Sequence, residues 1–217
     1  MKRWLPIAIL LTSALYIFEI RPEAQAFKFF FKLIPMWLIL YYTYSHMPSA
    51  KKCVHGLMLT GLFFGMLGDG LIMYWFVLGL AAFLIGHLFY TAGFLVQWRF
   101  SWLRFSSIVP IAIYSFIMGR ALVISLIEQN NAGLVVPVLF YIIVISLMGW
   151  SAIMTGNRGA IVGSFLFLIS DSILSWNLFV SPISYADLLI MTTYYSAQFI
   201  IARSATLPEQ REMKVHP

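Results

Sequence analysis

Long apolar runs separated by short polar connections make up most of the chain. Each run has about 17 to 23 residues, the length that an α-helix needs to cross a hydrocarbon layer roughly 30 Å thick. We therefore expect an all-α polytopic membrane domain over residues 1–205 and a polar tail over residues 206–217. The pattern predicts eight transmembrane helices, over residues 4–20, 29–45, 54–74, 76–97, 106–126, 134–154, 158–178 and 183–203.

The composition supports an integral membrane protein. Only 10% of the 217 residues are charged and 61% are apolar, whereas a soluble domain has about 25% charged residues. The net charge of +6 comes from basic residues at the ends of apolar runs, so no basic patch for nucleic acid is expected. Cys53 is the single cysteine, which excludes an internal disulfide and a cysteine-based metal cluster.

Positive charges predict the orientation of the chain. If the N-terminus is inside, ten lysine and arginine residues lie in cytoplasmic segments, against Arg21 and Lys28 on the outer side. Cytoplasmic loops of membrane proteins carry such an excess of basic residues. We expect both termini in the cytoplasm, in a bacterial inner membrane or, in a eukaryotic cell, an endomembrane. The sequence does not indicate an oligomeric state.

Three aspartates, Asp69, Asp171 and Asp187, fall inside the apolar runs. A charged side chain in hydrocarbon costs about 2.5 to 3.5 kcal/mol on insertion scales, so it usually faces a protein interior or a wet cavity. The sequence thus predicts a buried acidic site. Alternatively, the aspartates pair with basic residues and only hold the bundle together. The other candidate site residues are Lys32, His87, Arg120, Tyr194, Tyr195 and Gln198.

Small residues precede the first aspartate at helical spacing. Gly61, Gly65 and Asp69 share one helix face, where glycines allow a second helix to come close. We expect this helix to pack directly on the one that carries Asp171. Residues 163–171 also match the stretch ending at Asp69 in glycine, phenylalanine and aspartate at equal spacing. This match indicates a possible parallel repeat of four helices.

Several chemistries are excluded by their missing residues. Of the four histidines only His87 lies deep in a predicted span, so no converging metal ligands are expected. The chain has no P-loop, no dinucleotide-binding fingerprint, no Gly-x-Ser-x-Gly elbow and no cysteine nucleophile, so no cofactor is expected. Acid–base catalysis or ion transport by carboxylates remains.

Five short blocks resemble the signature of a known family. They are Lys32-Leu-Ile-Pro35-Met36, Gly68-Asp69, Gly86-His87, Ser170-Asp171-Ser172 and Tyr194-Tyr195-x-x-Gln198. In this order they resemble the YhhN-like lysoplasmalogenase family. Members usually have proline directly after the lysine of the first block, whereas Leu33 follows it here. The role of the lysine is therefore open.

The resemblance implies an eight-helix hydrolase that cleaves the vinyl ether bond of lysoplasmalogens. The products would be a fatty aldehyde and a glycerophospho-alcohol, and Asp69 and Asp171 would be catalytic. Such a reaction needs one protonated carboxyl and one ionised carboxylate, which two nearby aspartates can supply. The sequence leaves open which of them is the acid. Lys32 or Arg120 is a candidate for binding the lipid phosphate.

Other classes of function remain open. A proton-coupled transporter of a small or lipidic substrate would also place carboxylates and a histidine within the membrane. An aspartyl intramembrane protease needs two membrane aspartates, but Met66 stands where its Gly-x-Gly-Asp motif has the first glycine. A purely structural role would leave the aspartates as packing partners.

Overall fold

The computed structural model describes residues 4–18, 25–46 and 52–206. Eight long helices fill these ranges, with a short helix α5 (Trp102–Phe105) and a 3₁₀ turn (Ala132–Leu134) between them. They confirm the expected number and positions of helices. The expected tail lies outside the described residues except for Thr206. The long helices are α1 (Leu5–Phe18), α2 (Gln25–Ser45), α3 (Lys52–Leu71), α4 (Phe76–Leu95), α6 (Ile108–Glu128), α7 (Val135–Thr155), α8 (Arg158–Phe179) and α9 (Ala186–Thr206).

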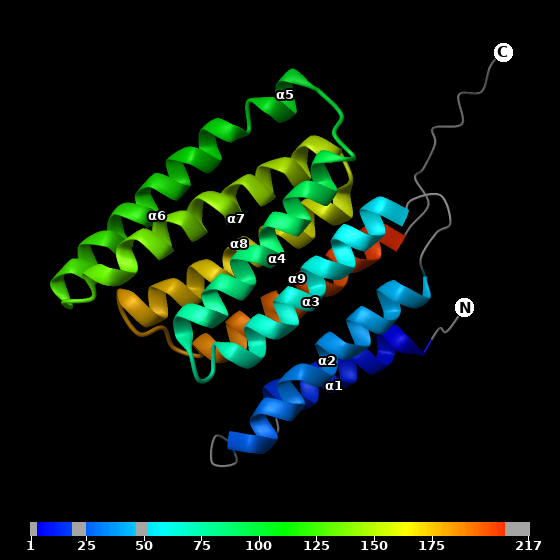
Figure 1. The fold of residues 1–217 in the computed structure, drawn as a ribbon, viewed down its shortest axis with the longest axis horizontal. Helices are drawn as coiled ribbons and strands as arrows, with labels where there is room; N and C mark the ends of the chain where they lie inside the picture. Colours follow the sequence, from blue (N-terminus) through cyan, green and yellow to red (C-terminus); the bar gives the residue numbers. More distant parts are fainter. Residues whose placement is uncertain (1–3, 19–24, 47–51, 207–217) are drawn as a thin grey trace.

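The long helices form one bundle (Figure 1). The helices α1 and α2 lie at one edge of the bundle and α6 lies at the opposite edge. The most extensive contacts join α3 to α4 and α8 to α9. Because α9 also contacts α1, α2 and α3, it connects α8 to the helices at the N-terminal edge of the bundle.

The turn between α7 and α8 shows how local sequence ends one helix and starts the next. Gly156 has φ 68°, a left-handed conformation that glycine adopts without a Cβ penalty, and it ends α7. The Asn157 side chain then accepts hydrogen bonds from Gly159 N at 2.9 Å and Ala160 N at 3.3 Å. This N-cap satisfies two amides at the start of α8.

Glycines bring α3 and α4 into backbone contact. A Cβ added to Gly61 would lie 3.1 Å from the carbonyl oxygen of Gly86, and one added to Gly86 would lie 3.0 Å from that of Gly61. Gly65, one turn further along α3, leaves no room for a Cβ, which would lie 2.6 Å from Gln198 Nε2 of α9. The expected close approach along this glycine row is therefore present, with α4 and α9 as the neighbours.

The expectation that the Asp69 and Asp171 helices pack directly on each other needs correction. The helices α3 and α8 share no extensive interface, because α9 packs against both of them. The sequence pattern showed a small-residue face on α3 but not which neighbouring helix would occupy it. The two carboxyl groups meet instead at a cavity, described below.

The outer surface of the bundle is apolar, as a bilayer requires. Large hydrophobic side chains such as Leu103, Phe116 and Val136 are exposed. Among the described residues, five segments are long and apolar enough to cross a membrane, and α1 is a shorter apolar helix. These features define a multi-pass integral membrane protein. The five segments are Cys53–Leu71, Phe76–Leu95, Trp102–Glu128, Ala132–Thr155 and Arg158–Phe179.

Candidate active site

A cavity of about 460 Å³ lies between α2, α3, α4, α8 and α9, beside the end of α1. Its polar wall includes Lys32, Asp69, Asp171 and Tyr194. The remaining wall is largely apolar, with side chains such as Phe76 and Leu174. The cavity is therefore amphipathic, and it brings together the two aspartates that lie 102 positions apart in the sequence.

Asp69 lies in the last turn of α3 and is surrounded by hydrogen-bond donors. Its side chain is 3% exposed, and Lys32 Nζ lies 3.4 Å from its Oδ1 atom. The Tyr194 hydroxyl donates to its Oδ2 atom at 2.7 Å. Two donors, one of them cationic, stabilise the ionised form of a carboxyl group.

A chain of side-chain hydrogen bonds leads to Asp69 from α4. The Tyr90 hydroxyl donates to Gln198 Oε1 at 2.6 Å. The Gln198 amide nitrogen donates to the Tyr194 hydroxyl oxygen at 3.1 Å. Because Tyr194 accepts this bond, its own proton is available for Asp69. Each link thus orients the next one toward the carboxylate.

Lys32 lies in α2 shortly before a proline. Pro35 has no N–H group, so the carbonyl oxygen of Phe31, four residues earlier, lacks its usual helical bond. The Tyr195 hydroxyl donates to the carbonyl oxygen of Lys32 at 2.8 Å, which links α9 to this part of α2. The lysine side chain is only 11% exposed. The first sequence block therefore builds a buried cation beside Asp69.

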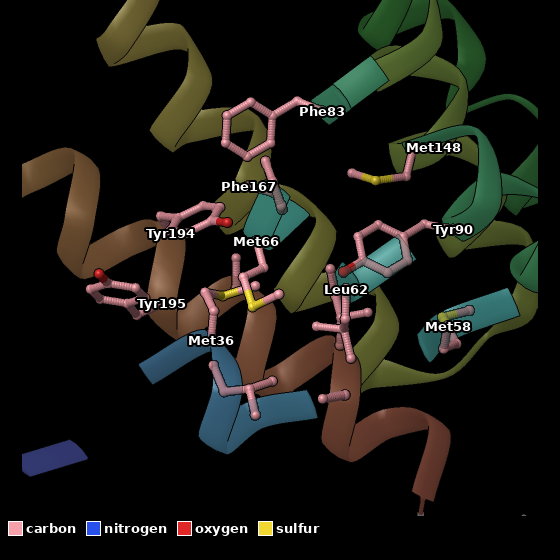
Figure 2. Packing of buried hydrophobic residues seen from close by; sticks show 14 of the residues in the cluster. Met36, Met58, Leu62, Met66, Phe83, Tyr90, Met148, Phe167, Tyr194 and Tyr195 are labelled. Atoms are coloured by element: carbon pink, nitrogen blue, oxygen red, sulfur yellow. The ribbon is translucent and has the colours of Figure 1, made fainter. Parts of the chain in front are cut away.

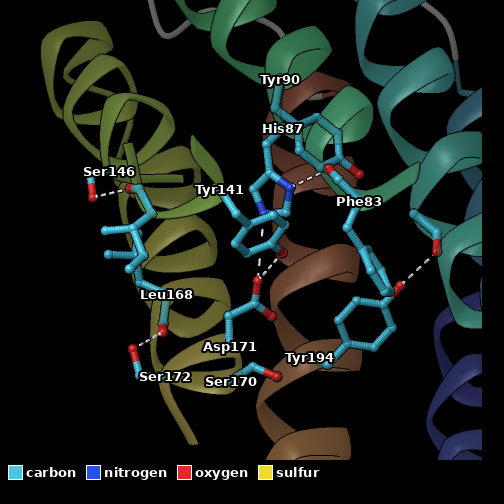
Figure 3. Close-up of polar contacts among 12 residues, drawn as sticks. Phe83, His87, Tyr90, Tyr141, Ser146, Leu168, Ser170, Asp171, Ser172 and Tyr194 are labelled. Carbon is cyan, nitrogen blue, oxygen red and sulfur yellow. Dashed lines mark hydrogen bonds and ion pairs between the residues drawn. The ribbon is translucent and has the colours of Figure 1, made fainter. Parts of the chain in front are cut away.

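Asp171, in the middle of α8, has different neighbours. The Tyr141 hydroxyl of α7 donates to its Oδ2 atom, and His87 Nε2 lies 3.9 Å from the same oxygen. The Nδ1 atom of His87 bonds to the carbonyl oxygen of Phe83, which can only accept, so Nδ1 carries a proton. Figure 3 shows the three side chains of Tyr141, His87 and Asp171 pointing toward one another.

His87 Nε2 is buried and has no hydrogen-bond partner among the described residues. Burial disfavours a charged imidazolium at a side chain that is 1% exposed, and in the neutral ring Nε2 presents a lone pair toward Asp171. A lone pair facing an ionised carboxylate at 3.9 Å is repulsive, whereas a carboxyl proton between them is attractive. The geometry around Asp171 therefore favours a carboxyl group that retains its proton.

Aromatic rings enclose this part of the site. Phe83 and Tyr194 meet edge to face with ring centroids 6.0 Å apart, and Phe167 and Tyr194 do so at 5.3 Å. Figure 2 shows these rings together with Met66 near the centre of the bundle. The His87 ring also packs on Phe167, at 4.6 Å. Such packing fixes the positions of the polar groups and limits access of water to them.

The remaining predicted residues lie further out. Asp187 lies in the first turn of α9 and lines the cavity, but its side chain is 91% exposed. Arg120 is exposed on α6 and does not line this cavity. The structure thus forms two polar networks beside one cavity. The network around Asp69 contains Lys32, Tyr194, Tyr195 and Gln198, and the network around Asp171 contains His87. Asp187 lies at the rim of the cavity and Arg120 lies outside it.

Two residues of the site were not found by sequence reasoning. Tyr141 donates to Asp171, and Lys28 lines the cavity one turn before Lys32. A signal existed for both. Tyr141 lies nearly two turns inside an apolar helix, away from the interfaces where tyrosine is most common, and Lys28 has the i, i+4 spacing that places it on the same helix face as Lys32.

The described residues form no set of metal ligands at the site. Within residues 4–18, 25–46 and 52–206, no three His, Cys, Asp or Glu side chains lie close enough to hold a metal ion. The groups available for chemistry at the cavity are the carboxyl groups of Asp69, Asp171 and Asp187, the amino groups of Lys28 and Lys32, and tyrosine hydroxyls, and the His87 imidazole lies beside Asp171.

A helical bundle with an apolar surface and two largely buried carboxyl groups at an amphipathic cavity defines a polytopic membrane protein with an acidic cavity between its helices. The chain belongs to the YhhN family, whose model matches residues 27–205. Lysoplasmalogenase TMEM86B of Homo sapiens is 31% identical over 209 residues, which cover 94% of this chain and 86% of the human protein. The Mus musculus lysoplasmalogenase TMEM86B is 28% identical, with 94% and 87% covered. No solved structure shows a significant match to the chain.

Proposed function

We propose that this protein is an ether hydrolase that cleaves the vinyl ether bond of lysoplasmalogens, with Asp171 and Asp69 as catalytic residues. The observation that carries the proposal is that two carboxyl groups with opposite surroundings line one amphipathic cavity. The family membership and the names of the human and mouse relatives support the substrate class.

The chemistry of a vinyl ether requires two different carboxyl groups. Hydrolysis begins when an acid transfers a proton to the β-carbon, which leaves an oxocarbenium ion at the carbon next to oxygen. Water then adds to this carbon and loses a proton. The first step needs a protonated acid, and the second is favoured by a carboxylate that stabilises positive charge and accepts a proton.

Asp69 is assigned the role of the ionised carboxylate. Lys32 at 3.4 Å and the Tyr194 hydroxyl at 2.7 Å supply the donors that such a group needs in a buried site. In this position it stabilises the oxocarbenium ion and accepts a proton from the attacking water. The hydrogen bonds from Tyr90 to Gln198 and from Gln198 to Tyr194 hold the Tyr194 hydroxyl in position to donate to Asp69.

Asp171 is assigned the role of the acid. Within the described residues its polar neighbours are Tyr141 and neutral His87, and no lysine or arginine is paired with it. Transfer of its proton to the β-carbon forms the new C–H bond. When the hemiacetal collapses, its hydroxyl proton returns to Asp171 while Asp69 gives its proton to the departing glycerol oxygen. Both carboxyl groups are then in their starting states.

The cavity offers separate surroundings for the two parts of the lipid. A smaller apolar hollow shares Phe83, Asp171 and Leu174 with the main cavity and continues toward Val138 and Phe179. This apolar side is assigned to the alkenyl chain, since hydrocarbon is favoured there over water. The vinyl ether bond would then lie between the chain and the charged groups.

Mass spectrometry of purified protein incubated with a lysoplasmalogen tests the proposal. We expect release of a fatty aldehyde, and in heavy water one deuterium on the α-carbon of the aldehyde, because that carbon receives the proton from Asp171. A lysolipid with a saturated ether should remain intact. An active double variant, Asp69→Asn with Asp171→Asn, would overturn the mechanism, and failure of wild-type protein to release aldehyde would overturn the function.

We also infer that all eight long helices cross the bilayer and that both termini are cytoplasmic. The excess of basic residues in one set of connections supports this topology. A cysteine introduced at Met213, in a Cys53→Ser background, should resist an impermeant thiol reagent added outside sealed cells. Strong labelling from outside would contradict the inference.

A parallel repeat of four helices is a further part of this proposal. The pairs α3 with α4 and α8 with α9 make the two most extensive contacts in the bundle, as a duplication predicts. The matching glycines also act alike. A Cβ on Gly61 would lie 3.1 Å from a carbonyl oxygen of α4, and one on Gly163 would lie 3.1 Å from the Ala197 carbonyl oxygen of α9.

A further inference from the structure

Two charged side chains at the rim of the cavity have no part in the proposed reaction. Lys28 lies in the first turns of α2 and Asp187 in the first turn of α9, and both line the cavity. Lys28 Nζ lies 4.0 Å from Asp187 Oδ2, and the two side chains are 31% and 91% exposed. An exposed ion pair of this length contributes little to stability, about 0 to 1 kcal/mol. Both groups are therefore available to bind a ligand.

The position of Lys28 relative to the carboxyl groups matches the length of a lysophospholipid. Lys28 precedes Lys32 by four residues, so it lies on the same face of α2 and about 6 Å further along the helix axis. Lys32 contacts Asp69, next to the reacting bond. In a glycerophospholipid five bonds separate the ether oxygen from phosphorus, a reach comparable to one helical turn of about 5.4 Å. A phosphate would therefore reach Lys28 while the ether bond lies at the aspartates.

The charges around the rim also match those of one class of head group. Lys28 and Lys32 are opposed by Asp69 and Asp187, so the polar end of the cavity has no net charge. A head group of phosphate plus amine is zwitterionic, with the ammonium group two carbons beyond the phosphate ester oxygen. A phosphate bound to Lys28 would leave the Asp187 carboxylate next to this ammonium group. A purely anionic head group would instead meet the repulsion of Asp187.

We propose that Lys28 and Asp187 form a head-group subsite for a zwitterionic phosphoamine, with the phosphate on Lys28 and the ammonium group on Asp187. The inference rests on the proposed function for the chemistry of the rest of the lipid. It gives Asp187 a binding role and adds Lys28 to the site.

Steady-state kinetics with two substrates tests the subsite. Both carry the same alkenyl chain, and one has a phosphoethanolamine head group while the other ends in phosphate alone. We expect Asp187→Asn to raise KM about two- to fivefold for the first substrate only, because it removes one exposed charge contact. Lys28→Gln should raise KM about fivefold or more for both, with kcat within about twofold of wild type.

Matched controls separate these effects from a general loss of charge. Glu128→Gln and Arg158→Gln change exposed residues of α6 and α8 that do not line the cavity, and KM should be unchanged. An equal rise of KM for both substrates in Asp187→Asn, or no rise for either, would overturn the subsite. The charge swap of Lys28→Asp with Asp187→Lys distinguishes a structural pair. A structural pair would recover wild-type KM in the swap, whereas the subsite would not.

Binding of an uncleavable lipid keeps the inference separate from the proposed function. A saturated 1-O-alkyl lysophosphoethanolamine should bind wild-type protein in detergent, and Lys28→Gln should weaken its binding about fivefold or more. If the wild type binds this lipid and the effect of Lys28→Gln is present but no vinyl ether is cleaved, the subsite stands and the proposed function falls. If vinyl ethers are cleaved and Lys28→Gln binds the analogue as wild type does, the subsite falls.

Discussion

The surroundings of Asp69 and Asp171 differ although both carboxyl groups line one cavity. Asp69 has a buried lysine and a tyrosine donor that is itself held by a chain of hydrogen bonds. Asp171 has a tyrosine donor and the unprotonated face of a neutral histidine. In the proposed mechanism these different neighbours give the same residue type two tasks. The difference implies that each substitution at the pair should have its own signature.

Removal of the acid should have the largest effect. We expect Asp171→Asn to lower kcat/KM for a lysoplasmalogen by about 10²- to 10⁴-fold, because no group then supplies the proton for carbon. The amide still accepts the Tyr141 hydrogen bond, so expression and the elution profile of the protein should stay close to wild type. Aldehyde release by the purified variant is the measurement. A variant that keeps more than a tenth of the wild-type rate would remove Asp171 from this role.

Loss of Lys32 should expose the cost of an unpaired Asp69. We expect Lys32→Met to lower stability by about 3 to 5 kcal/mol, because a buried carboxylate without its cation is strongly destabilising. Thermal unfolding in detergent measures the change. The double variant Lys32→Met with Asp69→Leu should recover much of it, since no charge is then left unpaired.

The same comparison predicts a different result at Asp171. Asp171→Leu leaves no lysine or arginine without a partner among the described residues. Its expected cost is about 1 to 3 kcal/mol, the penalty for leaving the Tyr141 hydroxyl without an acceptor. A loss as large as that of Lys32→Met would mean that Asp171 is ionised and paired, and would contradict its assignment as the acid.

A cationic analogue should distinguish the two carboxyl groups directly. An alkylated lysolipid with a protonated secondary amine in place of the ether oxygen resembles the oxocarbenium ion in charge. We expect Asp69→Asn to weaken its binding about 30-fold or more, because a buried charge partner is lost. Asp171→Asn should change it by less than about threefold, since a neutral acid is replaced by a neutral amide. The reverse order of effects in a binding titration would exchange the two roles.

Much of the fold could be predicted because its signals are local. The eight helices follow from the length of the apolar runs, and the turn at Gly156 and Asn157 follows from residue types that end and begin helices. The candidate site was also largely predictable, since Asp69 and Asp171 are costly in an apolar segment and hence conspicuous. The family resemblance added their expected function.

The rest depends on which helices become neighbours, and apolar faces do not specify this. The glycine row before Asp69 could accept any helix, and α9 rather than α8 packs against Gly65. Tyr141 was missed because a tyrosine hydroxyl in an apolar helix has no assigned partner until α7 and α8 come together. Arg120 was a candidate for binding the lipid phosphate, but its position within an apolar span does not determine which side of α6 faces the bundle.

The smallest expected effect concerns His87. The ring carries its proton on Nδ1, which faces the Phe83 carbonyl oxygen, and Nε2 faces Asp171. His87 therefore accepts a hydrogen bond from the Asp171 carboxyl group and does not donate one. We expect His87→Ala to lower kcat about tenfold or less with little change in KM, because the proton of Asp171 loses an oriented acceptor while the acid itself remains. His87→Gln, which offers an amide oxygen as an acceptor, should recover part of this loss. A decrease as large as that of Asp171→Asn, in a variant whose thermal unfolding matches wild type, would mean that the imidazole takes part in proton transfer and that the acid is a pair of residues.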